Sequence, residues 1–164
     1  MKLVFSRIVT CLFAAGIVIG MSLYQPAMGE EADAWGGKRR FAAEISAHNQ
    51  VTVIKSDGIG TVDIMFDIPT MTIDWYIDYQ GLTSAPISIH LHGPAQAGTN
   101  AVSIMDLGAN GLDSPIAGSM HVSDAHVKYM LLGWTYILLK TEKYPDGELR
   151  GKLDIVPPPG FSPQ

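Results

Sequence analysis

Two histidines separated by one residue are the side chains of this sequence best suited to chemistry. His90 and His92 lie in a segment in which polar residues alternate with Ile87, Ile89 and Leu91. This alternation predicts a β-strand whose apolar residues face the core and whose histidines share the other face. The two imidazoles then lie about 7 Å apart along the strand and can reach one zinc or copper ion. A metal site of this kind normally needs three or four protein ligands.

The third ligand has to come from another part of the chain. Among the remaining histidines, His121 is the best candidate because it lies in a short predicted strand at residues 118–122. His48 and His126 fall in a predicted loop and a predicted helical turn, where we expect surface positions. The alternative is that His90 and His92 bind no metal and either belong to a polar outer face or form hydrogen bonds with Arg150 or a nearby carboxylate.

The elements that must position these residues are short strands. Apolar alternation of period two, interrupted by turn residues, predicts about eight of them. Tyr144-Pro145-Asp146-Gly147 is the strongest turn signal. The segment Ser123–Leu132 is the one predicted helical turn, with Ser123 as its N-cap. We therefore predict an all-β, antiparallel Greek-key sandwich over residues 41–155, with strands at residues 41–45, 61–67, 71–79, 87–92, 101–107, 118–122, 134–140 and 148–155.

Alternation also predicts which side chains are buried. Trp75, Trp134 and Tyr136 are interpreted as core aromatic residues. Glu148 and Arg150 are spaced to project from one face of the last strand. For this pair we favour a structural ion pair or a network that fixes the turn, with anion binding as the alternative.

The N-terminus resembles an export signal. Lys2 and Arg7 precede an apolar run at residues 8–23, and small residues follow. We predict a signal peptide at residues 1–29, with an uncleaved anchor as the alternative. Residues 30–40 are expected to form a flexible lead-in, and the Pro-rich residues 156–164 a disordered tail. The protein is thus expected to be periplasmic or secreted, with no membrane span in its mature form.

Cysteine content and charge restrict the classes of function. The only cysteine, Cys11, lies in the apolar run, so the mature chain has no disulfide and no thiolate ligand. Removing Lys2 and Arg7 from the eleven basic residues leaves nine, against sixteen acidic residues. This balance disfavours nucleic acid as a partner. The sequence also contains no nucleophile-and-base motif, phosphate-binding loop or dinucleotide fingerprint.

Two segments together resemble the CHRD domain, a module named after chordin. The first runs from Ile89 to Ala95 and contains the two histidines. The second runs from Tyr136 to Leu153 and contains the Gly-Glu-Leu-Arg-Gly sequence at residues 147–151. Residues 41–46 also resemble the first strand of the family, so the resemblance covers roughly residues 41–155.

The resemblance implies an immunoglobulin-like sandwich with a layout similar to Cu/Zn superoxide dismutases. It also implies a copper site made by the histidine pair and a later histidine. In this sequence Lys140 stands at that later position. A lysine ammonium repels a metal cation, so the implied ligand set is incomplete.

These observations support three hypotheses of decreasing weight. The first is a secreted module with a non-enzymatic binding or structural role toward an unidentified protein. The second is a metal-binding protein that holds copper or zinc through His90 and His92. The third is an enzyme similar to superoxide dismutase.

Overall fold

The computed structural model describes residues 36–159. The predicted signal peptide, most of the lead-in and the end of the predicted tail lie outside these residues. The strands are β1 (Lys38–Ser46), β2 (Ile59–Asp67), β3 (Thr72–Gln80), β4 (Pro86–His92), β5 (Ser103–Asp106), β6 (Ile116–His121), β7 (Tyr136–Thr141), β8 (Leu149–Lys152) and β9 (Asp154–Val156). A 3-10 turn, η2 (Ala47–Asn49), follows β1, and one α-helix, α1 (Asp124–Leu131), precedes β7.

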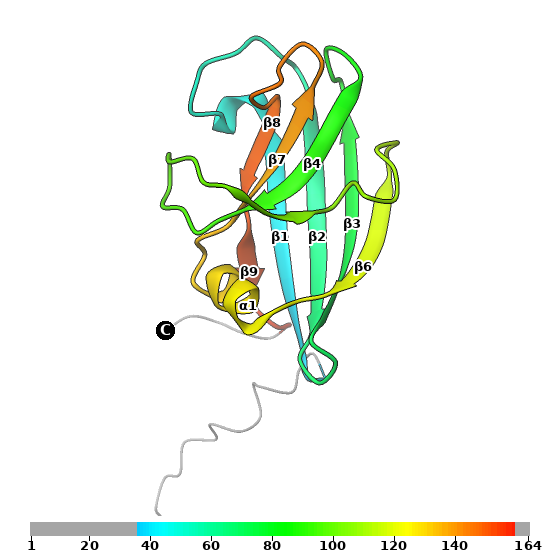
Figure 1. Cartoon of the computed structure of the whole chain (residues 1–164), viewed down its shortest axis with the longest axis vertical. Coiled ribbons are helices and arrows are strands. Elements are labelled where there is room, and N and C mark those ends of the chain that lie inside the picture. The colour runs from blue at the N-terminus through cyan, green and yellow to red at the C-terminus, as the bar shows by residue number, and fades with distance from the viewer. Residues whose placement is uncertain (1–35, 160–164) are drawn as a thin grey trace, which may run out of the picture.

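All of these strands belong to one antiparallel sheet. Their order is β5-β4-β7-β8-β1-β2-β3-β6, and β9 pairs with β1 beyond the end of β8. Figure 1 shows the sheet curled, with α1 at one end of the molecule. The all-β antiparallel class is confirmed. The finer prediction of a two-sheet Greek-key sandwich is not confirmed, because the pairing is continuous from β5 to β6.

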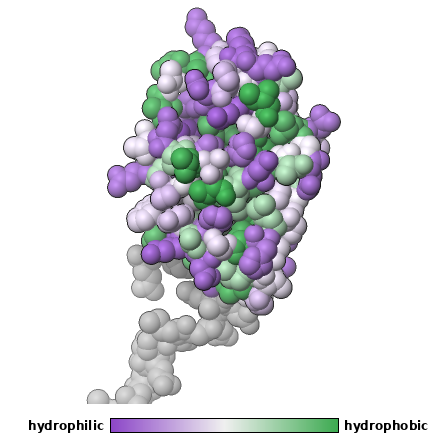
Figure 2. Space-filling model, viewed as in Figure 1, coloured by the Kyte–Doolittle hydropathy of each residue, from purple (hydrophilic) through white to green (hydrophobic). Residues whose placement is uncertain are grey.

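The core forms where the inner faces of the curled strands meet. Apolar residues at alternate positions are fully or almost fully buried, as period-two patterning requires. Trp75 is typical: its ring is buried and its indole N–H donates to the carbonyl of Leu107, 3.1 Å away. Hydrophobic residues on the surface shown in Figure 2 occur as small groups among hydrophilic ones. The buried residues include Phe41, Ile45, Ile64, Ile73, Ile77, Ile89, Leu91, Ile137, Leu139 and Leu149.

The helix confirms the predicted turn. The Ser123 side chain accepts a hydrogen bond from the backbone N–H of His126, which satisfies one of the free donors at the helix start. Val127 and Met130 are its buried residues. In the described part of the chain, no helix is both long and apolar enough to cross a membrane.

Two residues predicted to be buried, Ile87 and Trp134, are exposed, and so is Ile155 at the end of the last strand. Ile87 is 47% exposed, because the β4–β7 pairing shifts register between Pro86 and Ser88. Ile155 faces the same side as its partner Phe41 but is 46% exposed, since β9 pairs only with β1 at the margin of the sheet. Trp134 is 43% exposed because β7 begins only at residue 136.

Several predicted boundaries also move. The expected lead-in extended to Arg40, but β1 already starts at Lys38 and pairs along its whole length with β2. The predicted last strand is divided into β8 and β9 at Leu153, whose N–H donates to the carbonyl of Thr135.

Candidate functional site

Three polar side chains from adjacent strands stack on one another on the outer face of the sheet. His92 (β4), Tyr136 (β7) and Arg150 (β8) are each at most 6% exposed. The His92 and Tyr136 rings are almost parallel, with centroids 5.0 Å apart. The Arg150 guanidinium carbon lies 3.6 Å from the centre of the Tyr136 ring, a cation–π contact. We call this set the outer stack.

The outer stack holds the loop of residues 93–102. Nδ1 of His92 lies 2.9 Å from the carbonyl oxygen of Ala101, and the Ala101 N–H donates to the Tyr136 hydroxyl. The Arg150 guanidinium donates to the side-chain oxygen of Asn100 at 2.7 Å and to the carbonyl of Thr99 at 2.6 Å. Each member of the stack therefore fixes the same short stretch of loop, and the two hydrogen bonds from Arg150 are charge-assisted.

The surroundings of His92 favour its neutral form, because its pKa is held below the ordinary value. Burial lowers the pKa of His92, the Ala101 carbonyl raises it to a smaller extent, and the nearby His90, Lys140 and Arg150 lower it. A carbonyl can only accept, so Nδ1 carries the proton. The lone pair of the buried Nε2 has no hydrogen-bond partner among the described residues.

His90 lies beside the outer stack but makes different contacts. Its ring centroid is 6.0 Å from that of His92, with the two rings almost perpendicular. Its Nε2 is 3.8 Å from a carboxylate oxygen of Asp106 on the neighbouring strand β5. The structure therefore brings the predicted histidine pair together, with one member in the stack and the other half-buried at its side.

The third predicted ligand does not join the pair. His121 is exposed on β6, opposite Thr72 of β3 and at the other end of the strand order. Lys140 lies on β7 opposite Ser88. Since Ser88 is two residues before His90 on β4, Lys140 and His90 share one face of the sheet. Within residues 36–159, no group of three histidine, cysteine or acidic side chains is arranged to hold a metal ion. The described residues therefore bring only His90 and His92 of the candidate ligands together.

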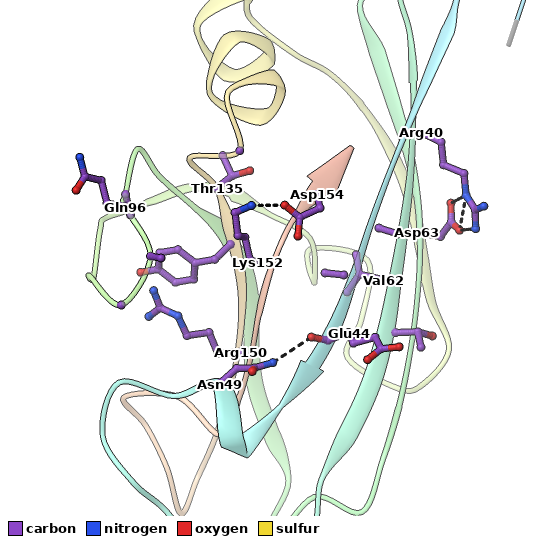
Figure 3. Close-up of a pocket in the computed structure, with 18 of the residues that line it drawn as sticks. Arg40, Glu44, Asn49, Val62, Asp63, Gln96, Thr135, Arg150, Lys152 and Asp154 are labelled. Carbon is purple, nitrogen blue, oxygen red and sulfur yellow. Dashed lines mark hydrogen bonds and ion pairs between the residues drawn. The ribbon is translucent and has the colours of Figure 1, made fainter. Parts of the chain in front are cut away.

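A cleft of about 820 Å³ lies next to the loop that the outer stack holds. We call it the outer cleft. Its floor is formed by β1 and β2. Its walls are formed by residues 95–98, by residues 133–136, and by Arg150 and Lys152 of β8 with Asp154 of β9. Figure 3 shows Arg150 and Thr135 on one side of the cleft and Arg40 with Asp63 on the other. The hydroxyl of Thr135 is buried and has no hydrogen-bond partner in the described part of the chain.

Most charged groups of the outer cleft are paired with each other. The Arg40 guanidinium contacts both carboxylate oxygens of Asp63, and the Lys152 ammonium contacts the Asp154 carboxylate (Figure 3). The cleft therefore presents donors and acceptors side by side without a large excess of either charge.

Comparison with known families agrees with these elements. The family model described as CHRD domain matches residues 41–153. The chain belongs to the CHRD domain family. No curated protein and no solved structure gave a significant match.

The structure assigns definite positions to the motif residues of this CHRD domain. His92 and Arg150 belong to the outer stack. Glu148 is fully buried and accepts hydrogen bonds from the hydroxyls of Ser56, Thr83 and Thr141 and from the N–H of Thr83. The two structural roles predicted for Glu148 were an ion pair with Arg150 and a network that fixes the turn. The hydrogen bonds of Glu148 correspond to the network, and Arg150 instead donates to Thr99 and Asn100.

Sequence reasoning missed the outer cleft of the CHRD domain. Its residues come from six separate parts of the chain, and the two motif segments supply only some of them. The small residues Ala95, Ala97 and Gly98, directly after the histidine strand, were the one local sign of an accessible wall. The role of Arg150 in holding this wall depends on a loop fifty residues earlier in the sequence.

Proposed function

We propose that this CHRD domain protein is an exported, non-enzymatic binding module whose ligand lies in the outer cleft. The observation that supports this most is the loop of residues 93–102, which His92, Tyr136 and Arg150 hold in place as a cleft wall. A wall fixed before binding lowers the entropy cost of binding. The cleft volume also lies within the range of about 300–1,000 Å³ usual for ligand sites.

The chemistry of the lining supports binding more than catalysis. The described residues that line the outer cleft include no histidine, cysteine or serine. Two of its three carboxylates, Asp63 and Asp154, are paired with Arg40 and Lys152, and the third, Glu44, is exposed. A catalytic site usually combines a nucleophile with a positioned base, and Glu44 alone does not supply that combination.

Export is the second part of this proposal. It rests on Lys2 and Arg7 before the apolar run 8–23, and on the small residues after it. Cleavage is expected near Gly29 or Ala34. Mass measurement of the exported protein tests this, and an intact Met1 would favour the anchored alternative.

The cleft proposal is tested by mapping small polar probes on the ¹⁵N-labelled protein by NMR. We expect probes that bind to shift the amide signals of Gly98, Gly133 and their neighbours. Ala42→Trp places a large ring on the cleft floor and should abolish these shifts. Ala125→Trp adds the same ring to the exposed surface of α1 and should preserve them. Shifts that map outside the cleft, or that survive Ala42→Trp, would overturn the proposal.

A second candidate function is weak binding of copper or zinc by His90 and His92. The free Nε2 lone pair of His92, with the other ring nitrogen held by a carbonyl, is the arrangement found in histidines that ligate metals. We expect the affinity for copper or zinc to be low, because only two imidazoles are available and Lys140 repels the cation. The described residues give no support to superoxide dismutase activity.

Changing Lys140 to His tests this candidate. The new imidazole would share a face with His90 and replace a repelling cation. We expect copper or zinc affinity to rise at least tenfold, about 1.4 kcal/mol, in calorimetric titration. The gain should vanish when His90→Ala is added, because ligands of one ion act as a unit. Tight binding by the wild type that Lys140→His leaves unchanged would show that another residue is the third ligand.

A further inference from the structure

The outer cleft carries no excess charge. Three basic residues line it, and so do three acidic ones: Arg40, Arg150 and Lys152 against Glu44, Asp63 and Asp154. Two of the basic residues are paired with acids inside the cleft, and the third donates to Thr99 and Asn100 of the wall. A polyanion or polycation gains little from such a surface, since its charges would have to displace existing partners.

The floor of the cleft is also unsuited to an added peptide strand. β1 pairs with β2 on one side and with β8 and β9 on the other, and β2 pairs with β1 and β3. The floor strands therefore have no free edge for the backbone of a peptide. The described lining contains no leucine, isoleucine, phenylalanine, methionine or tryptophan, so it offers no large apolar pocket for a peptide side chain.

The remaining features fit rings that carry hydroxyl groups. Tyr76 lines the cleft beside the Arg40–Asp63 pair, because it is the β3 partner of Asp63, and its side chain is 53% exposed. An exposed aromatic face can pack against an apolar face of a ring. The ion pairs then present donors and acceptors together, which suits hydroxyl groups because each of them both donates and accepts.

We propose that the ligand of the outer cleft is a neutral oligosaccharide whose terminal ring packs on Tyr76. This rests on the proposed binding function and specifies its ligand class. The small lining residues Ala42, Ala95 and Gly98 leave room for the other rings, and the Arg40–Asp63 and Lys152–Asp154 pairs provide hydrogen bonds at two places along the cleft.

The experiment titrates the full mature protein with tetrasaccharides, monitored by NMR and calorimetry. The neutral probes are chitotetraose, cellotetraose and maltotetraose; the comparison probes are tetragalacturonate and an uncharged Ser-Ala tetrapeptide. We expect at least one neutral sugar to bind with shifts in the cleft. Tyr76→Ala should weaken this binding at least tenfold, while Tyr76→Phe, which keeps the ring, and Tyr129→Ala, on α1 outside the cleft, should change it little.

The alternative outcomes separate the two proposals. Cleft shifts caused only by tetragalacturonate or the peptide would overturn the sugar assignment and leave the binding cleft in place. Sugar binding unaffected by Tyr76→Ala would contradict the assigned contact. Failure of all three neutral sugars to shift any cleft amide would overturn the sugar assignment, and the Ala42→Trp comparison would then decide whether the cleft binds anything.

Discussion

Replacing Glu148 by alanine is expected to lower the free energy of unfolding by about 4 kcal/mol. The carboxylate is fully buried and accepts four hydrogen bonds, from Ser56, from Thr141 and twice from Thr83. These donors join two loops to the end of β7. A buried donor that loses its acceptor costs about 1–3 kcal/mol, so several lost together reach the upper range of single-mutation effects.

Urea unfolding of matched variants measures this effect. Glu142→Ala removes an exposed carboxylate six residues away and should change stability by less than about 0.5 kcal/mol. Glu148→Gln keeps the shape but not the charge, so an intermediate loss is expected. Equal stability of the Glu148→Ala and Glu142→Ala proteins would show that the network does not stabilise the fold.

The same residue predicts a pH dependence. Burial raises the pKa of Glu148. The hydrogen bonds from Ser56, Thr141 and Thr83 together lower it by more than burial raises it, so the pKa lies below its ordinary value. A folded-state pKa below the unfolded one contributes stability that is present above the unfolded pKa, about 4.3. This stability is lost as pH falls through the folded pKa. The stability difference between wild type and Glu148→Gln should therefore be constant above about pH 5 and shrink below about pH 4.

Gly151→Ala should destabilise the protein by at least about 3 kcal/mol. A Cβ at this position would lie 2.3 Å from the carbonyl oxygen of Glu44 and 2.8 Å from a methyl carbon of Ile45. The oxygen belongs to the backbone of β1, so relief requires β8 and β1 to separate. Overpacking of a well-packed site costs about 1–3 kcal/mol or more.

Gly98→Ala is the matched control for this substitution. Gly98 has a positive φ of 75° but nothing within 4 Å of the added Cβ, so only the cost of a left-handed residue remains, about 1–2 kcal/mol. Thermal or urea unfolding of both variants measures the difference. A Gly151→Ala protein as stable as Gly98→Ala would mean that the two strands separate more easily than this packing implies.

The fold was largely predictable because burial of one sheet face imposes a period of two on the sequence. The strand containing Trp75 and Ile77 shows this pattern without interruption, and the structure confirms it. The exposure of Ile87 and of Ile155 comes from a register shift and from an incompletely paired strand end, respectively. Neither feature can be recognised from the alternation of apolar residues, because both depend on how the neighbouring strand pairs with the segment.

The candidate site was predictable only in part. The shared position of His90 and His92 follows from strand geometry, and the structure places them side by side. The role of His92 in holding Ala101 could not be predicted. It depends on Tyr136 and Arg150, whose strands lie far from the histidine strand in the sequence.

Hydrogen exchange in an Arg150→Met variant tests most directly whether the outer stack fixes the loop that walls the cleft. Methionine keeps an apolar stem but loses the hydrogen bonds to Thr99 and Asn100. Because each charge-assisted bond contributes about 1.5–3 kcal/mol, amides of residues 99–102 should exchange at least tenfold faster, while the Ile137 amide in β7 keeps its rate. Lys152→Met, at the exposed position two residues further along the same face of β8, should leave the loop unchanged, because within residues 36–159 Lys152 makes no hydrogen bond to the loop. Loop exchange equal to wild type in Arg150→Met would contradict the account.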